Sequence, residues 1–201
     1  MKKLVLTLVV GALAIGGCNK AEDRPQAAPI AIDWKGELQL DIEKQRRALE
    51  DFDIDAGAAL MCEQYRDAYR EKRESELPTM ASIATPEQAA DPTYIATLPE
   101  SIKQRYPETY TEDRQPVADA AARQDPVAFR AAAINLMSRV FKVREQEVDN
   151  IDIEGGEQPE KATADVTTTT TLNGGPPETH TVQKSFVLQG TDWLDCTDPS
   201  H

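Results

Sequence analysis

The chain has few aromatic residues, few histidines and no excess of positive charge. Phe, Trp and Tyr together make up 5% of the 201 residues, so we expect a modest hydrophobic core. Lys and Arg number 22 against 35 Asp and Glu, which gives a formal net charge of −13 at pH 7. A surface this acidic disfavours binding to nucleic acid, or to the phosphate-rich face of a membrane, through a basic patch.

Long apolar runs are also scarce. After residue 18 no run approaches the length of a membrane span, so the sequence predicts that the rest of the chain is water-soluble. Its length suits one domain rather than two.

Several catalytic signatures are absent from the sequence. Gly-x-Ser-x-Gly, the P-loop and His-Glu-x-x-His do not occur, so the corresponding hydrolase, NTPase and metalloprotease mechanisms lose their usual support. The two histidines, His180 and His201, have no Cys, Asp or Glu partner at ligand spacing, and His180 is predicted to be an exposed strand residue among threonines. The sequence therefore assigns no catalytic residue, no cofactor and no metal ligand.

The first eighteen residues carry the strongest signal. Two lysines precede an apolar run at residues 4–15, and Gly16 and Gly17 then lead to Cys18, a pattern typical of a secretory signal. Residues 15–18, Ile-Gly-Gly-Cys, resemble the lipobox of bacterial lipoproteins. That resemblance implies a diacylglyceryl group on the Cys18 sulfur, cleavage before Cys18 and acylation of the new amino group. The alternatives are an ordinary signal peptide with an incidental cysteine, or a retained signal anchor.

The lipoprotein resemblance implies three parts in the chain. Residues 1–17 would be the signal peptide, residues 18–31 a lipidated polar tether, and residues 32–201 a single domain. Loss of the two lysines with the signal would change the formal net charge from −13 to −15. The lipid on Cys18, rather than charge, would then hold the protein at the membrane, because several acyl chains make release very slow.

The residue after the lipidated cysteine bears on location. Asn19 is not the aspartate that this family associates with retention in the inner membrane. In a Gram-negative cell we therefore expect the outer membrane, with the domain facing the periplasm.

Two further cysteines remain, Cys62 and Cys196. An even pair in an exported protein predicts a disulfide with a single connectivity, the alternative being two buried thiols. Closing so long a loop would stabilise the fold by about 4 to 5 kcal/mol in the chain-entropy model.

Helical patterns fill the first two thirds of the domain. Apolar residues at helical spacing predict an amphipathic helix over 34–52 and a second one over 58–69 that turns Cys62 into the core. Six prolines between residues 77 and 125 predict short turns without a long helix. Asp125 followed by Pro126 predicts an N-cap that opens a well-buried helix ending at Phe141.

The last third predicts an antiparallel β-meander. Alternating or β-branched segments at 147–154, 162–171, 179–189 and 193–196 are separated by glycine-containing turns. In the final strand Leu194 and Cys196 share a face, so that directing Leu194 toward the helices would place the disulfide between the second helix and this strand. The threonine run at 167–171 predicts one solvated β face, with O-glycosylation or adhesion as the alternative.

The predicted fold is therefore α+β, with N-terminal helices packed on a curled antiparallel sheet formed by the C-terminal third. This order of elements and the closing hairpin at 186–196 resemble the cone-shaped fold of nuclear-transport-factor-like and ketosteroid-isomerase-like domains. The alternative is a twisted sheet with a helical layer of another topology. The resemblance implies a cone interior lined by a mainly apolar set, Met61, Tyr65, Phe129, Leu136, Val140, Phe186 and Leu188.

The acidic segment 51–57 resembles the start of an EF-hand calcium loop. Its glycine falls one residue late and its twelfth position is Cys62, so an N-terminal cap for the following helix explains the acids better.

Two functional hypotheses remain open at this point. The first is a non-enzymatic module on a lipid tether that binds an envelope protein or a small apolar ligand. The second is an isomerase- or hydratase-like enzyme that uses the cone cavity. Tyr65 and Tyr69 fit the helical core stripe and Asp67 lies off it, so no residue is assigned to that chemistry.

Overall fold

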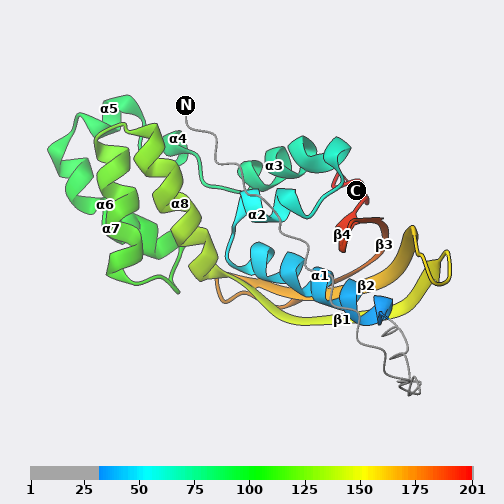
Figure 1. The fold of residues 1–201 in the computed structure, drawn as a ribbon. Helices are drawn as coiled ribbons and strands as arrows, with labels where there is room; N and C mark the ends of the chain where they lie inside the picture. The colour runs from blue at the N-terminus through cyan, green and yellow to red at the C-terminus, as the bar shows by residue number, and fades with distance from the viewer. Residues whose placement is uncertain (1–31, 201) are drawn as a thin grey trace, which may run out of the picture. The chain divides into compact units, whose positions relative to one another are not determined.

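The computed structural model describes residues 32–200, and the chain from Asp33 onward forms one compact unit. Helices precede a four-stranded antiparallel sheet, which confirms the predicted α+β class (Figure 1).

The predicted signal and tether, including Cys18, lie outside the described residues. Among the described residues, no helix has both the length and the apolar character needed to cross a membrane. The elements are α1 Trp34–Glu50, α2 Ile54–Ala59, η1 Glu63–Tyr65, α3 Arg66–Ser75, α4 Met80–Ile83, α5 Pro86–Ala89, α6 Pro92–Arg105, α7 Thr111–Ala122, α8 Pro126–Val140, β1 Phe141–Glu154, β2 Lys161–Leu172, β3 Glu178–Gln189 and β4 Asp192–Asp195.

Helix α1 matches the amphipathic helix predicted at 34–52. Its N-cap is Asp33, whose carboxylate accepts a hydrogen bond from the Gly36 amide at 3.1 Å. Leu38 and Ile42 are fully buried against the sheet. The helix ends before Phe52, whose φ of 56° is left-handed and whose ring is buried.

The second predicted helix is interrupted. The chain leaves α2 at Leu60, and Met61 forms a parallel bridge with Asp195 before η1 and α3 begin. The Cys62 amide donates to the Asp195 carbonyl at 2.8 Å, and the Asp195 amide donates to the Leu60 carbonyl at 2.9 Å. The prediction of one continuous helix was wrong because these backbone groups pair with the end of β4 instead of with the next helical turn.

The proline-rich middle is more helical than predicted. Pro86 and Pro92 occupy the first turns of α5 and α6, where a missing N–H costs little. Pro99 and Pro116 lie inside α6 and α7, where each removes a helical hydrogen bond at a cost of about 3 kcal/mol. The expectation of short turns alone was therefore wrong, since both helices are held by a shared apolar cluster.

That cluster joins α4, α6, α7 and α8, and we call it the helical cluster. Asp125 caps α8 as predicted, accepting from the Val127 and Ala128 amides. The buried residues of α8 include Phe129 and Leu136. Many of the buried partners are alanines, which allow the helices to approach closely. The helical cluster consists of Ile83, Ala84, Leu98, Ile102, Val117, Ala118, Ala120, Ala121, Phe129, Ala132, Ala133 and Leu136.

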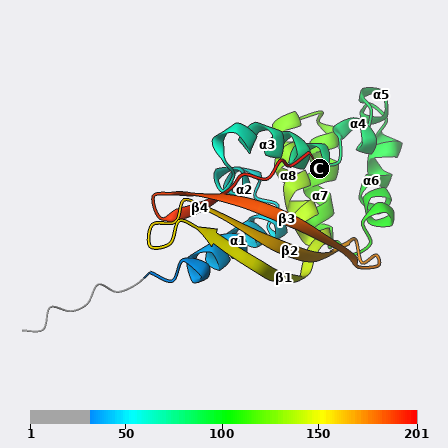
Figure 2. The same ribbon diagram turned by 90° about the vertical axis from the view of Figure 1, so that its right-hand side faces the viewer.

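The sheet is a curled meander in the order β1-β2-β3-β4 (Figure 2). Helix α8 runs directly into β1, so the first strand begins six residues earlier than predicted. Helix α1 packs on one face of the sheet, which we call the concave face. The buried residues between them are Leu38, Ile42, Ala162, Ala164, Val166, Phe186 and Trp193.

Two details of the predicted interior were wrong. Trp193, not Leu194, packs toward α1, with its ring 6.5 Å from that of Trp34 in an edge-on arrangement. Phe129 and Leu136 belong to the helical cluster instead of a cone interior. The apolar residues that were expected to form one interior are divided because α8 carries its buried face into the bundle and only its last turn reaches the sheet.

Candidate functional site

A groove of about 330 Å³ lies between helices α1–α3 and the concave face of the sheet. Its lining is mainly apolar, and residues from α1, α2, α3 and all four strands contribute to it. The lining residues are Gln45, Arg46, Leu49, Gly57, Met61, Tyr69, Lys72, Arg73, Glu76, Phe141, Gln146, Val166, Thr168, Thr170, His180, Val182, Lys184, Asp195, Thr197, Asp198 and Pro199.

The floor of the groove consists of cross-strand rows. Gln146, Thr168 and His180 stand opposite one another on β1, β2 and β3, and Val166 pairs with Val182 in the next row. The rows face the helices because side chains repeat every two residues along a strand. The floor therefore has a polar row beside an apolar one.

The threonine run has two faces instead of the single solvated face predicted. Thr168 and Thr170 line the groove. On the opposite face, the hydroxyls of Thr167 and Thr169 form hydrogen bonds with those of Thr181 and Thr179 at 2.8 and 2.9 Å. The same residue type thus supplies hydroxyls to the groove and ties β2 to β3 behind it.

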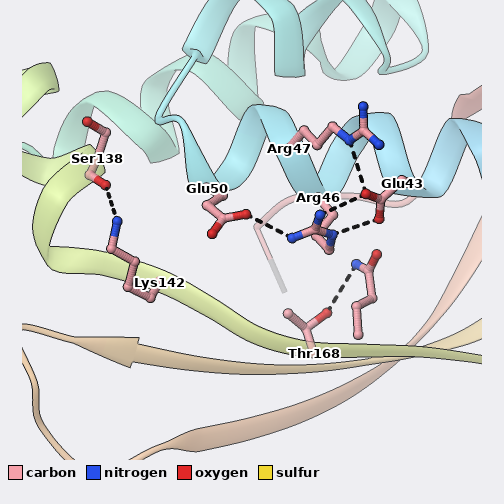
Figure 3. A network of polar contacts seen from close by, with 8 residues as sticks. Glu43, Arg46, Arg47, Glu50, Ser138, Lys142 and Thr168 are labelled. Atoms are coloured by element: carbon pink, nitrogen blue, oxygen red, sulfur yellow. Dashed lines mark hydrogen bonds and ion pairs between the residues drawn. The ribbon is translucent and has the colours of Figure 1, made fainter.

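The α1 side of the groove is fixed by an ion-pair network (Figure 3). The Arg46 guanidinium donates to Glu43 at 2.7 Å and to Glu50 at 2.8 Å, and Arg47 donates to Glu43 at 3.0 Å. The hydrogen bond from Arg46, aided by Arg47, lowers the pKa of Glu43 from 4.5 to about 2. These pairs hold the Arg46 side chain in place above the floor.

Tyr69 lies where α3 approaches α2. A Cβ at Gly57 would overlap the Tyr69 hydroxyl, so glycine is needed for this close approach. Burial raises the pKa of Tyr69 above its ordinary value of 10, which keeps the hydroxyl protonated at neutral pH. The Tyr69 hydroxyl is therefore a neutral polar group on the groove wall.

One end of the groove contains a buried carboxylate, Asp195. Its Oδ2 accepts from Lys184 Nζ at 2.7 Å, and its Oδ1 accepts from the Thr197 amide at 2.9 Å. Lys184 also donates to Gln45 Oε1 at 2.8 Å, which links β3 to α1. Because both Asp195 oxygens are engaged, this carboxylate is bound in a structural pair and is poorly placed to accept a proton from a substrate.

Residues after β4 form one rim of the groove. The Cys62–Cys196 disulfide confirms the predicted pairing and has a Cα–Cα distance of 5.0 Å. Lys72 Nζ donates to the Pro199 carbonyl at 2.5 Å, so α3 holds the segment at a second point. The disulfide therefore positions residues 197–199 beside the groove.

Arg73 has the most unusual environment in the groove. The residue is only 7% exposed, and its guanidinium carbon lies 4.2 Å from the centre of the Phe52 ring and 5.6 Å from that of Phe141. Its Nη1 pairs with Glu76, whereas its Nη2 is buried without a hydrogen-bond partner among the described residues. A buried charged donor that lacks an acceptor is costly.

Of the other residues singled out by the sequence, Asp53 and Asp67 lie outside the groove, whereas His180 lines it. Asp53 caps α2, accepting from the Ala56 amide at 3.0 Å, as the cap interpretation of segment 51–57 predicted. Asp67 is an exposed partner of Arg70. His180 is exposed as predicted, but it stands on the concave face at the mouth of the groove. Within residues 32–200, no group of three or more His, Cys, Asp or Glu side chains could hold a metal ion.

Most of the groove residues could not be predicted from the sequence. Arg73, Thr168 and Thr170 carried no recognisable motif. Because side chains alternate along a strand, the threonine run predicts that alternate hydroxyls share a face. The sequence does not show which of the two faces is turned toward the helices. Arg73 gave no comparable signal, because a polar stripe on α3 predicts a solvated surface.

No family model, curated protein or solved structure matches this chain. The features that bear on its function are the groove and the lipobox-like residues before Cys18.

Proposed function

We propose that the protein is a lipid-anchored envelope lipoprotein whose domain binds a small, largely apolar ligand in the groove. The lipobox-like residues 15–18 support the anchor on Cys18 and, with Asn19, a place at the outer membrane facing the periplasm. The observation that carries the binding proposal is the groove itself. A concave, mainly apolar site of this volume with a few fixed polar groups is the usual form of a small-molecule site.

The arrangement of charged groups favours binding over an isomerase- or hydratase-like reaction. Such chemistry needs a base that can reach the substrate. Asp195 is the one carboxylate of the groove lining that is buried, and its oxygens are occupied by Lys184 and Thr197. Glu76 is 37% exposed and pairs with Arg73.

The binding site can be tested with two matched variants on β3. Val182 is 44% exposed and lines the groove, whereas Val187 is 38% exposed and lies on the other face of the same strand. Val182→Phe should weaken binding of the dye 1-anilinonaphthalene-8-sulfonate by about tenfold, equivalent to ~1.4 kcal/mol, because the ring occupies the site. Val187→Phe should leave binding unchanged. Equal dye binding by both variants would contradict the proposed site.

The anchor is tested separately at Cys18. Cys18→Ser should abolish labelling by radioactive palmitate and leave the protein uncleaved or free of the membrane. Equal labelling of the variant and the wild type would rule out lipidation at this cysteine.

A further inference from the structure

Two hollows meet at Arg73. A second hollow of about 570 Å³ lies between α8, the start of β1 and the turn after β2. It shares four lining residues with the groove, Arg73, Glu76, Phe141 and Thr170. The hollows therefore adjoin at the Arg73–Glu76 pair, and an elongated molecule lying in the groove would pass this pair or end at it.

The surroundings of Arg73 are suited to a carboxylate. Its guanidinium is planar and can form two parallel hydrogen bonds with a carboxylate. Nη1 already binds one carboxylate, that of Glu76, while the buried Nη2 has no partner among the described residues. The Phe52 ring covers one face of the guanidinium and limits access of water, which strengthens its interaction with an anion.

The groove next to Arg73 is suited to an aliphatic chain. Val166, Val182, Leu49 and Met61 supply apolar surface, and the methyl group of Thr168 adds to it. A chain lying here would remove apolar area from water, which favours binding.

We infer that the ligand is an aliphatic monocarboxylate, with its carboxylate at Arg73 and its chain along the valine-lined floor. This inference rests on the proposed binding function and adds the chemical class of the ligand. On a chain with a formal net charge of −13, an anion would be repelled from most of the surface, so a site for it requires a cation held away from water. Arg73 meets that requirement because it is nine-tenths buried.

The experiment compares three probes of equal chain length, dodecanoate, dodecan-1-ol and dodecylammonium. Calorimetric titration below micelle-forming concentrations would use residues 18–201 carrying Cys18→Ser, exported behind a conventional signal peptide so that the disulfide forms. The chain from Asp33 onward is a compact unit, so the absent lipid should not affect its fold. Dodecanoate should bind at least about tenfold more tightly than the alcohol, as expected for a charge-assisted hydrogen bond in a sheltered site, and the ammonium should bind most weakly.

Two variants locate the anion. Arg73→Met keeps an apolar stem against Phe52 and should remove the preference for dodecanoate over dodecan-1-ol. Glu76→Gln removes the competing carboxylate and should tighten dodecanoate binding severalfold, which provides a test even if Arg73→Met fails to fold. Arg130→Met, which alters an exposed arginine paired with Glu74, is the control and should change neither probe.

The outcomes separate the inference from the proposed function. Binding of dodecanoate and dodecan-1-ol with equal affinity, or an unchanged preference in Glu76→Gln, would overturn the carboxylate assignment and leave an apolar site. Failure of all three probes and of the dye to bind the wild type would overturn the binding function itself.

Discussion

The helical cluster and the sheet with α1–α3 bury their residues in different ways. In the helical cluster, alanines and larger apolar side chains from α4, α6, α7 and α8 fill the space between helices, and every member of the cluster is apolar. Between α1–α3 and the sheet, the space is only partly filled. Arg73, Asp195 and Lys184 are held there by specific partners, and a groove remains. The comparison shows a bundle whose interior is filled with apolar side chains and a sheet half that is cross-linked by the disulfide and leaves a groove open.

The largest expected effect concerns the disulfide, which belongs only to the sheet half. Cys62→Ala with Cys196→Ala opens a link between residues 134 apart in sequence. Urea unfolding should show a loss of about 4 kcal/mol in the free energy of unfolding. Hydrogen exchange should quicken at the Cys62 and Asp195 amides, which bridge α2 and β4, more than at amides within α8. Equal acceleration in both halves would contradict the comparison.

The next effect contrasts one truncation in each half. Leu136 is fully buried in the helical cluster, so Leu136→Ala should lower the free energy of unfolding by about 3 kcal/mol through lost burial and a cavity. Val182 is partly exposed on the groove floor, so Val182→Ala should change it by less than about 0.5 kcal/mol. The same urea titration measures both. Similar losses in the two variants would show that the groove is packed as tightly as the bundle.

The smallest effect is the pH dependence from the α1 network. The folded pKa of Glu43, about 2, lies below its ordinary value of 4.5, so its contribution to stability is present above pH 4.5 and is lost as the pH falls toward 2. The network is largely at the surface, so the contribution should stay below about 1 kcal/mol. Glu43→Gln should differ from wild type at pH 7 and converge with it near pH 2. The control Glu71→Gln removes an exposed carboxylate on α3. A constant difference between wild type and Glu43→Gln at all pH values would disprove this role for Glu43.

The elements that local sequence could predict are those held by local interactions. Helix α1 and the cap of α8 at Asp125 follow from apolar spacing and capping chemistry, and the strands follow from period-two alternation. The disulfide followed from an even cysteine pair in a chain predicted to be exported. In each case the residues that carry the signal lie close in sequence or have a single partner.

The elements that could not be predicted depend on distant partners. The break at Met61 arises because its backbone pairs with Asp195, which lies far along the chain. Pro99 is tolerated inside α6 because Leu98 and Ile102 are buried in the helical cluster. The role of Arg73 requires Phe52 and Phe141 to meet above it, which only the assembled fold reveals.

The central claim is that the sheet half, and not the bundle, holds the ligand. The most direct measurement is the change in backbone amide ¹H–¹⁵N shifts when dodecanoate is titrated into the isotopically labelled protein. We expect the largest shifts at Arg73, Thr168 and Val182, with Leu98 and Ile102 in the helical cluster unaffected. Shifts centred on Leu98 and Ile102, or no shifts at a saturating concentration, would contradict it.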